Sequence, residues 1–467
     1  MTDTRIDNAI IGTLDADSRI LRDTSLLVRE GRIAALGNRL ELEAVSPTAA
    51  TVDAAGKLLM PGFANIHTHM TMVVGRGVHE DIPMPHSPPF KPEKGLPPFT
   101  LPPLTDEETI LIVRLAALEA IRSGTTAVLE DNINIGIYAE ALADTGLRLL
   151  LCERAWDRGN LRSGEMDRFV VDEALGEACI NKIRALHERW NGAESGRIHV
   201  GIAAWAPDIC SPGYLRRLAG LRHELGCITT IHLNQFWREV TFMEAVHGRK
   251  PTEFLADIGF LHDGLICAHC RCMSQSEERT LGRSGAGVAY NSVIGARRGM
   301  PARITDLEAH GCTVGMGTDN FAEDMIEVIR HGLYMERARL DDGGAPLPEE
   351  VLRWATVNGY RLMGIPDGGA IAVGNRADLI LVDLMSPHLV PHLRPLDTFV
   401  HQANSGDIAD VMVDGKWLMR DGTVTVMDEA AIVRDAQVAS ATAWERLFAT
   451  LPADQRPKGW HAPLSPA

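Results

Sequence analysis

The sequence contains no run of about 18 apolar residues, so no membrane-spanning helix is expected. It also lacks an excess of basic residues. With 46 Lys and Arg against 62 Asp and Glu, the net charge is −16, which argues against the basic surface that nucleic acid requires. The first residues show no charged segment followed by an apolar one, so no secretory signal is predicted. We therefore expect a cytoplasmic protein.

The eight cysteines follow no regular spacing, and most lie inside apolar runs. In a long chain without an export signal, this usage is typical of reduced core thiols and not of a disulfide framework. Cys270 and Cys272 would share one face of a strand, which also fits part of a zinc knuckle. No second cysteine pair lies at the distance of a zinc finger, so we favour core thiols.

A chain of 467 residues is long enough for one large α/β domain and a smaller one. Residues 5–36 alternate short β-type runs with turns, and the same pattern of short strands and turns returns after residue 370. Between them, strands alternate with helices, as in βα units around a parallel sheet. The number of apolar runs fits a barrel of eight strands, although the spacing alone also fits an open sheet.

The stretch from Lys57 to His69 is predicted to be a short buried strand that ends in His67 and His69. Residues i and i+2 of a strand point to the same face, so the two imidazoles can meet at one point. In a parallel barrel, catalytic groups collect at the carboxyl ends of the strands. Two such nitrogens are half of a divalent-metal site with an open position. Taken alone, the motif fits two loop histidines equally well.

Three later β-type runs also end in residues that can bind a metal or move protons. They are 227–231 followed by His232, 265–268 followed by His269, and 312–318 followed by Asp319. One such residue alone is usually structural, but several on neighbouring strands converge around one mouth of the sheet. Three further strand-end residues are predicted to contact the substrate: Asn291, Ser292 and Asp208.

Residues 75–104 contain nine prolines and directly follow the two histidines. A long segment of this kind is predicted to be a loop that covers the site, and a surface loop without a role is the alternative. Thr105 and Glu108 then form a capping box that opens a helix through Arg122.

At this point the pattern resembles the amidohydrolase superfamily, over nearly the whole chain. Residues 61–69 match its P-G-x-x-x-x-H-x-H, residues 317–319 match its eighth-strand G-T-D, and residues 374–383 resemble its G-x-x-A-D-L-x-x-x-D. The resemblance implies a (β/α)8 TIM-type barrel with a small β-sandwich built from both chain ends. The predicted boundaries are 1–58 and 369–430 for the sandwich, 59–368 for the metal-binding barrel, and 431–467 for a C-terminal helix with an extended tail.

The resemblance also implies that one divalent metal is held by four ligands, which are His67, His69, His232 and Asp319. Zinc is the expected metal, and iron or cobalt accepts the same ligands. No lysine lies at the fourth-strand end, 198–207, where binuclear members carry a bridging carbamylated lysine. The metal makes hydroxide available from water at neutral pH. Asp319 would take the proton of the water, and His269 would orient the nucleophile or the developing oxyanion.

Within the superfamily, the sequence pattern of this chain most resembles that of cytosine and guanine deaminases and triazine hydrolases. The fifth-strand motif of those enzymes is H-x-x-E. In this chain Gln235 stands where that glutamate is expected, and it can form hydrogen bonds but cannot transfer a proton at neutral pH. Glu239 lies one helical turn further and is a conceivable substitute. The departure favours hydrolysis of an open-chain carbonyl, as in the phenylurea hydrolases and molinate hydrolase that this chain also resembles.

The main prediction is therefore a metal-dependent hydrolase of a small urea, carbamate, thiocarbamate or amide, with a role in xenobiotic degradation. The alternative is a deaminase or dechlorinase of a nitrogen heterocycle. A non-enzymatic metal-binding protein of the same fold is the third possibility, and the intact ligand set argues against it. We expect a small-molecule substrate and a homo-oligomer.

Overall fold

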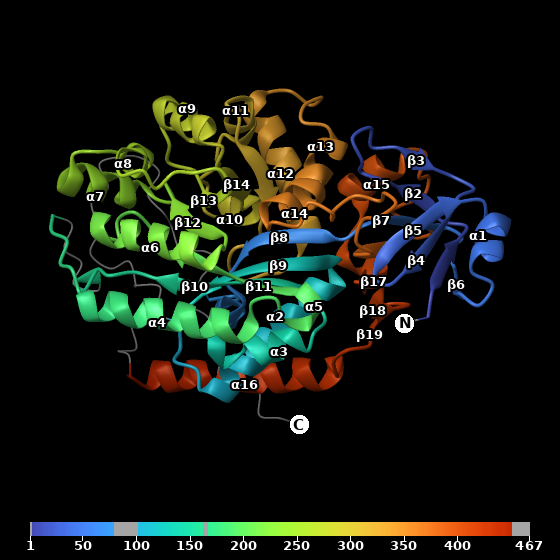
Figure 1. Cartoon of the computed structure of the whole chain (residues 1–467), viewed down its shortest axis with the longest axis horizontal. Helices are drawn as coiled ribbons and strands as arrows, with labels where there is room; N and C mark the ends of the chain where they lie inside the picture. Colours follow the sequence, from blue (N-terminus) through green and yellow to red (C-terminus); the bar gives the residue numbers. More distant parts are fainter. Residues whose placement is uncertain (1, 79–100, 162–166, 451–467) are drawn as a thin grey trace.

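The computed structural model describes residues 2–78, 101–161 and 167–450 of the chain. At its centre, eight parallel strands close into a barrel in which each strand pairs with the next and the last pairs with the first (Figure 1). The strands are β8 (Phe63–Thr68), β9 (Thr125–Asn132), β10 (Arg148–Ala155), β11 (Ile198–Ala204), β12 (Thr229–Leu233), β13 (Leu265–His269), β14 (Gly287–Tyr290) and β15 (Thr313–Met316). The predicted (β/α)8 barrel is confirmed.

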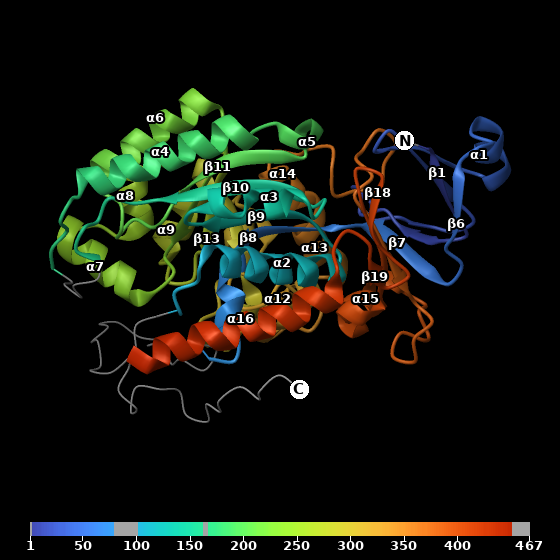
Figure 2. The same cartoon turned by 90° about the horizontal axis from the view of Figure 1, so that it is seen from below.

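Helices surround the barrel strands on the outside (Figures 1 and 2). Because both faces of the strands are covered, burial does not alternate along them, and every residue of β12 and β13 is buried. The helices and helical turns of the described chain are α1 (Arg39–Val45), η1 (Met70–Gly75), α2 (Asp106–Arg122), η2 (Ile135–Ile137), α3 (Ala139–Ala143), α4 (Glu173–Trp190), α5 (Ala193–Gly196), α6 (Pro212–Leu225), α7 (Trp237–His247), α8 (Pro251–Asp257), α9 (Gln275–Ser284), α10 (Ser292–Arg297), α11 (Ile304–Ala309), α12 (Met325–Leu340), α13 (Pro348–Arg353), η4 (Trp354–Asn358), α14 (Gly359–Leu362), α15 (Pro395–Gln402), η5 (Ser405–Asp407) and α16 (Glu429–Thr450).

Two further sheets come from the chain ends and lie beside the barrel (Figure 2). One has four strands in the order β5-β4-β1-β6, and the other has seven in the order β19-β18-β17-β16-β7-β2-β3. An apolar cluster with members from both sheets packs between them, among them Ile6, Leu59 and Leu381. Their strands are β1 (Thr4–Asp7), β2 (Ile10–Gly12), β3 (Ile20–Leu21), β4 (Ser25–Arg29), β5 (Arg32–Gly37), β6 (Ala50–Asp53), β7 (Lys57–Pro61), β16 (Leu379–Asp383), β17 (Ile408–Val413), β18 (Lys416–Arg420) and β19 (Thr423–Val424).

The single strand predicted from Lys57 to His69 is in fact two strands that belong to different sheets. β7 pairs with β16 and β2 in the seven-stranded sheet, whereas β8 pairs with β9 and β15 in the barrel. Gly62 separates them, and a Cβ at this position would lie 2.2 Å from the Thr126 side chain. Only glycine allows the chain to pass so close to the neighbouring strand. β7 crosses the predicted boundary between residues 58 and 59, and the domain boundaries stay a prediction.

The predicted capping box is present at the start of α2, where the Thr105 and Glu108 side chains each accept the other residue's backbone N–H. α16 packs against α2 and is tied to it by an ion pair between Arg122 and Glu429 at 3.0 Å. Most of the proline-rich segment and the predicted tail, at 79–100 and 451–467, lie outside the described residues. All eight cysteines are free thiols.

Within the described ranges, no helix has the length and apolar character needed to cross a bilayer. The cytoplasmic location and the homo-oligomeric state stay predictions.

Candidate metal centre

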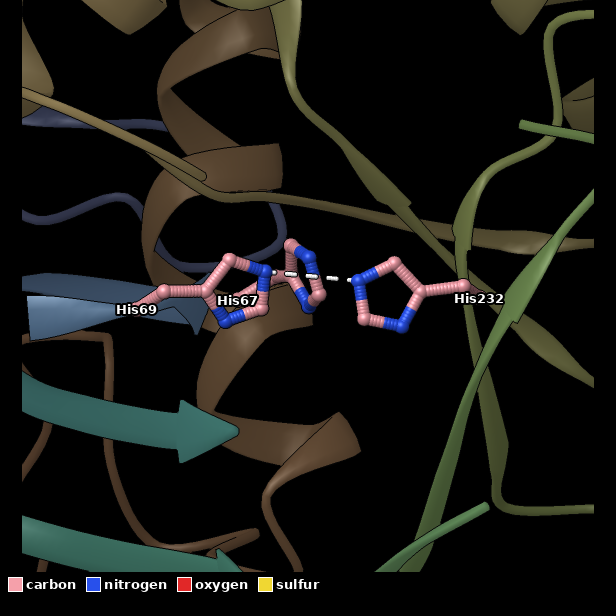
Figure 3. Close-up of side chains that lie close together, drawn as sticks. All are labelled: His67, His69 and His232. Carbon is pink, nitrogen blue, oxygen red and sulfur yellow. Dashed lines mark hydrogen bonds between the residues drawn. The ribbon is translucent and has the colours of Figure 1, made fainter. Parts of the chain in front are cut away.

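Five predicted side chains meet at the mouth formed by the carboxyl ends of the barrel strands. They are His67 in β8, His69 directly after it, His232 in β12, His269 at the end of β13, and Asp319 in the loop after β15. Each is at most 4% exposed. Figure 3 shows the rings of His67, His69 and His232 gathered around one point, although they come from separate strands.

His67, His69 and His232 each offer a ring nitrogen within 4.8 Å of the other two. The Nε2 atoms of His69 and His232 are 3.3 Å apart, which is the contact drawn as a dashed line in Figure 3. Both ring nitrogens of His67 are buried and have no hydrogen-bond partner among the described residues. Buried polar atoms without partners are rare in folded proteins, and here they fit lone pairs that point at an ion.

Asp319 closes the centre from the loop after β15, the strand that neighbours β8. One carboxylate oxygen lies 3.4 Å from His69 Nε2 and 3.9 Å from His67 Nε2, and the other lies 3.7 Å from His269 Nδ1. Neither oxygen accepts a hydrogen bond from any described residue. A buried carboxylate is costly unless it is paired or binds a metal, so this donor set fits a divalent cation.

The protonation states favour metal binding. Burial, with the nearby Arg154 and Arg271 charges, lowers the pKa of His67 to about 3. Burial also lowers the pKa of His69 and His232 well below the usual value, so the rings are neutral and keep their lone pairs. Burial raises the pKa of Asp319 to about 6, and a bound cation would favour its ionised form.

Backbone pairing with β8 holds Asp319 in place. Its N–H donates to the His67 carbonyl at 3.0 Å, and its own carbonyl accepts from the His69 N–H at 3.3 Å. The Thr68 hydroxyl donates to the buried Glu323 carboxylate at 2.6 Å, and the Thr318 hydroxyl donates to it at 3.1 Å. This network fixes the loop after β15 against the strand that carries the two histidines.

A second layer orients the imidazoles and includes two residues that the sequence analysis does not identify, Asp131 and Arg154. The Nδ1–H of His69 donates to the Asp131 carbonyl at 2.5 Å, and His232 Nδ1 lies 3.5 Å from the Asp131 carboxylate. Arg154 Nε donates to the other oxygen of that carboxylate at 2.8 Å. The hydrogen bond at Nδ1 fixes the His69 ring with its Nε2 toward the centre, where Arg154 Nη2 also lies 3.3 Å from that atom. Their sequence signal is the polar residues that end the apolar runs beginning at 125 and 147.

The three predicted substrate-contact residues have different environments. Asn291 Nδ2 lies 3.0 Å from His269 Nδ1, so it touches the cluster directly. The Ser292 hydroxyl donates to the Val328 carbonyl at 2.6 Å and is engaged in helix packing. Asp208 follows β11, and burial raises the pKa of its carboxyl group.

Gln235 lies in the loop after β12, and Glu239 from α7 folds back onto the same loop. The Glu239 carboxylate accepts the backbone N–H of Asn234 at 2.8 Å and that of Gln235 at 2.7 Å. Burial and the nearby charge of Asp208 raise the pKa of Glu239 well above its usual value. Glu239 therefore shapes the loop that presents Gln235, and both of its oxygens are already engaged there.

The chain is similar to known proteins over most of its length. The profile of the amidohydrolase family matches residues 58–418. A 5-methylthioadenosine/S-adenosylhomocysteine deaminase from Desulforudis audaxviator is 31% identical over 417 residues, which cover 88% of this chain and 92% of that protein. A 5'-deoxyadenosine deaminase from Methanosarcina mazei is 29% identical over 445 residues, which cover 94% and 98%.

Two solved structures show the same fold. An adenosine deaminase from Xanthomonas campestris with bound zinc superposes with a TM-score of 0.83 at 24% identity, covering 95% of this chain and 99% of that one. An atrazine chlorohydrolase from Arthrobacter aurescens TC1, complexed with zinc, gives a TM-score of 0.81 at 20% identity, with 94% and 100% covered.

Proposed function

Because the chain belongs to the amidohydrolase family, we propose that it is a metal-dependent deaminase that removes the amino group of a nitrogen heterocycle, of the adenine nucleoside class. The chain is a metal-dependent enzyme that acts on carbon–nitrogen bonds other than peptide bonds. The observation that carries the finer assignment is the likeness to nucleoside deaminases at 29–31% identity over about nine tenths of both chains.

This proposal takes up the alternative of the sequence analysis. The main prediction, a urea, carbamate or thiocarbamate substrate with a role in xenobiotic degradation, finds no support in these relatives, which are named as deaminases. That prediction depends on Gln235 and on a resemblance to phenylurea hydrolases and molinate hydrolase. A single side chain carries less weight than a likeness that extends along nearly the whole chain, so we set the open-chain substrates aside.

The proposed ligands are His67, His69, His232 and Asp319, with zinc as the metal. A bound divalent ion lowers the pKa of water toward about 7 and so supplies a nucleophile at neutral pH. Asp319 accepts the proton of that water and passes it to the departing amine. His269, held by Asn291, donates a hydrogen bond to the oxygen that adds to the ring.

Gln235 is the residue at which this chain departs from the H-x-x-E motif of the deaminases that it resembles. Its side-chain amide can donate a hydrogen bond to a ring nitrogen but cannot protonate it. Protonation during the reaction therefore falls to Asp319, which carries the proton taken from the water. Deamination should then be slower than in a site with a glutamate at position 235.

The test is a substrate panel on the zinc-loaded protein, with ammonia release as the readout. The panel contains adenosine, 5'-methylthioadenosine, 5'-deoxyadenosine and S-adenosylhomocysteine, together with a phenylurea and a thiocarbamate. We expect turnover of at least one nucleoside and of neither open-chain compound. Asp319→Asn, purified in the same way, controls for contaminating host deaminase. Turnover of only the urea or the thiocarbamate would overturn the proposal.

Gln235→Glu sharpens this test, because it restores the carboxylate of the H-x-x-E motif that the chain resembles. A positioned general acid contributes about 10²-fold or more, so we expect kcat for the accepted nucleoside to rise by about that factor. An unchanged kcat on a nucleoside substrate would show that position 235 does not limit proton transfer.

A further inference from the structure

Arg271 lies two residues after His269, and no part of the chemistry described above uses it. All three of its guanidinium nitrogens are buried, and none of them has a hydrogen-bond partner in the part of the chain that the structure describes. Arginine is almost never fully buried unless it is paired. A buried cation without hydrogen bonds is costly, so the fold retains this one at a substantial cost in stability.

The main chain holds Arg271 at the mouth of the barrel. Its N–H donates to the Asn234 carbonyl at 3.1 Å, and the Cys272 N–H donates to the same oxygen at 2.8 Å. The guanidinium carbon lies 5.5 Å from the centre of the Phe236 ring. Both contacts tie the loop after β13 to the loop that carries Gln235, so the charge is fixed beside the proposed reaction site.

The charge of Arg271 acts on the metal centre. Among the charged groups around Asp319, Arg271 is the one that most lowers its pKa, followed by Arg298 and Arg154. Arg271 also lowers the pKa of His269. Three guanidinium groups therefore lower the pKa of this carboxyl group, and the charge of Asp131 raises it, in a protein whose net charge is −16. A divalent cation in the centre would make this excess of positive charge larger.

The neighbouring acidic groups do not offset this charge through hydrogen bonds. The Glu239 oxygens accept the two amides of the loop after β12, and neither makes a hydrogen bond to Arg271. A glutamate at position 235 would add a carboxylate next to Phe236, whereas Gln235 is neutral. An amide in place of the expected acid, and an arginine without side-chain hydrogen bonds to the described residues, therefore occur on adjacent loops.

We propose that Arg271 binds an anionic oxygen group of the substrate, a carboxylate or a phosphate, and so selects anionic heterocycles over neutral ones. This inference rests on the proposed deaminase function. The planar guanidinium fork matches the two oxygens of such groups, and hydrogen bonds between oppositely charged partners are roughly twice as strong as neutral ones. Binding of the anion would satisfy the three buried nitrogens and offset the positive charge at the mouth.

The test uses matched pairs of amino-heterocycles in which only the second member, called the anionic member, carries an anionic oxygen group: adenosine with adenosine 5'-monophosphate, 5'-methylthioadenosine with S-adenosylhomocysteine, and 4-aminopyrimidine-5-carboxamide with 4-aminopyrimidine-5-carboxylate. S-adenosylhomocysteine also carries an ammonium group, so its pair tests the carboxylate and not the net charge. The first pair reports on phosphate and the other two on carboxylate. We expect the wild type to have a higher kcat/KM for the anionic member of at least one pair. Equal or lower values for every anionic member, with turnover of the neutral ones, would overturn the inference.

Arg271→Gln should lower the ratio of kcat/KM for the preferred anionic member to that for its neutral partner by about 100-fold, mainly through KM of the anionic member. Arg271→Lys keeps the charge but lacks the planar guanidinium, and we expect it to lower the same ratio by about 10-fold. The Lys variant also serves if the Gln variant does not fold. Arg279→Gln, on the exposed face of α9, is the matched control and should leave both members unchanged. Equal losses for both members of a pair would assign Arg271 a merely structural role.

Failure of the deaminase function would be visible separately, as absence of ammonia release from every pair by the wild type. In that case, the affinities of the same six compounds for the zinc-loaded protein, measured by calorimetry, test whether Arg271 binds an anion. Tighter binding of an anionic member by the wild type, lost in Arg271→Gln, supports the anion site. Equal affinities within every pair overturn it.

Discussion

Asp378 and Asp319 are both almost completely buried, but their surroundings are opposite. The Asp378 carboxylate accepts four hydrogen bonds, from Arg148 Nε at 2.8 Å, Arg148 Nη2 at 3.0 Å, the Tyr360 hydroxyl at 2.8 Å and the Asp414 N–H at 2.8 Å. Asp319 accepts none from the described residues. The hydrogen bonds of Asp378 are all made within the protein, which is typical of a structural carboxylate. The Asp319 carboxylate lacks them, which fits a group that binds a ligand from outside the chain.

Two arginines whose guanidinium nitrogens are buried repeat this contrast. Arg148 from β10 pairs with Asp378 and also with Asp414, and so joins the barrel to the seven-stranded sheet at the end away from the metal centre. Arg271 has no hydrogen-bonding partner among the described residues. Burial alone therefore does not distinguish a structural charge from a functional one. The number of hydrogen bonds that a buried charge makes within the protein distinguishes the two.

The largest effect should come from Asp319→Asn. The amide cannot take the proton of the attacking water, so kcat for the accepted nucleoside should fall by about 10³-fold or more. The fold should be unaffected, because the native carboxylate makes no hydrogen bond that the amide would lose. Steady-state kinetics and urea unfolding of the same preparation check both parts. An activity close to that of the wild type would remove Asp319 from the proposed chemistry.

Asp378→Ala should give the reverse pattern. It leaves Arg148 buried without its main partner, which typically costs about 3–5 kcal/mol of unfolding free energy, while kcat per folded molecule stays near that of the wild type. Asp383→Ala, at the exposed end of β16, the strand that directly follows Asp378, is the control and should cost less than about 1 kcal/mol. If Asp378→Ala impaired kcat as strongly as Asp319→Asn, the contrast between the two ends of the barrel would not hold.

Asp131 lies between these extremes, since one of its oxygens is bonded to Arg154 and the other lies 3.5 Å from His232 Nδ1. Asp131→Asn should weaken metal binding about 10–100-fold, because orienting partners of ligating histidines typically contribute that much. Competition with a chelator, followed by metal analysis, measures the change. Excess zinc should restore most of the activity, and a loss that zinc does not rescue would argue for a direct role in the chemistry.

The sequence predicts the barrel and the five clustered side chains because both depend on local patterns. Continuous apolar runs indicate buried parallel strands, and polar residues at their ends must converge once the sheet closes. The break at Gly62 escapes this reasoning, since the apolar run continues through it while its two halves pair with different sheets. Strand pairing is a property of the whole fold and not of the run.

The partners of a buried charge are equally invisible in the sequence. From the sequence, Glu239 is predicted only to lie one helical turn beyond Gln235. The local sequence does not predict that its carboxylate accepts the backbone N–H groups of the loop after β12. Arg271 is unremarkable in the sequence for the same reason. Its significance is the absence of a hydrogen-bond partner in the described chain, and that can be recognised only when all the neighbours are known.

The smallest effect concerns a charge pair on the surface, where solvent competes with the partners. A side-chain hydrogen bond from Arg446 lowers the pKa of Glu108 below its usual value. A lowered pKa means that the pair stabilises the folded state above the unfolded pKa, near 4.5, and that this contribution is lost as the pH falls through the folded value.

Glu108→Gln isolates the charge, because glutamine can still accept the Thr105 N–H of the capping box. We expect the variant to be less stable by at most about 1 kcal/mol at pH 7 and equal to the wild type near pH 3, as measured by urea unfolding. A difference that persists at low pH would mean that the cap, and not the ion pair, carries the effect.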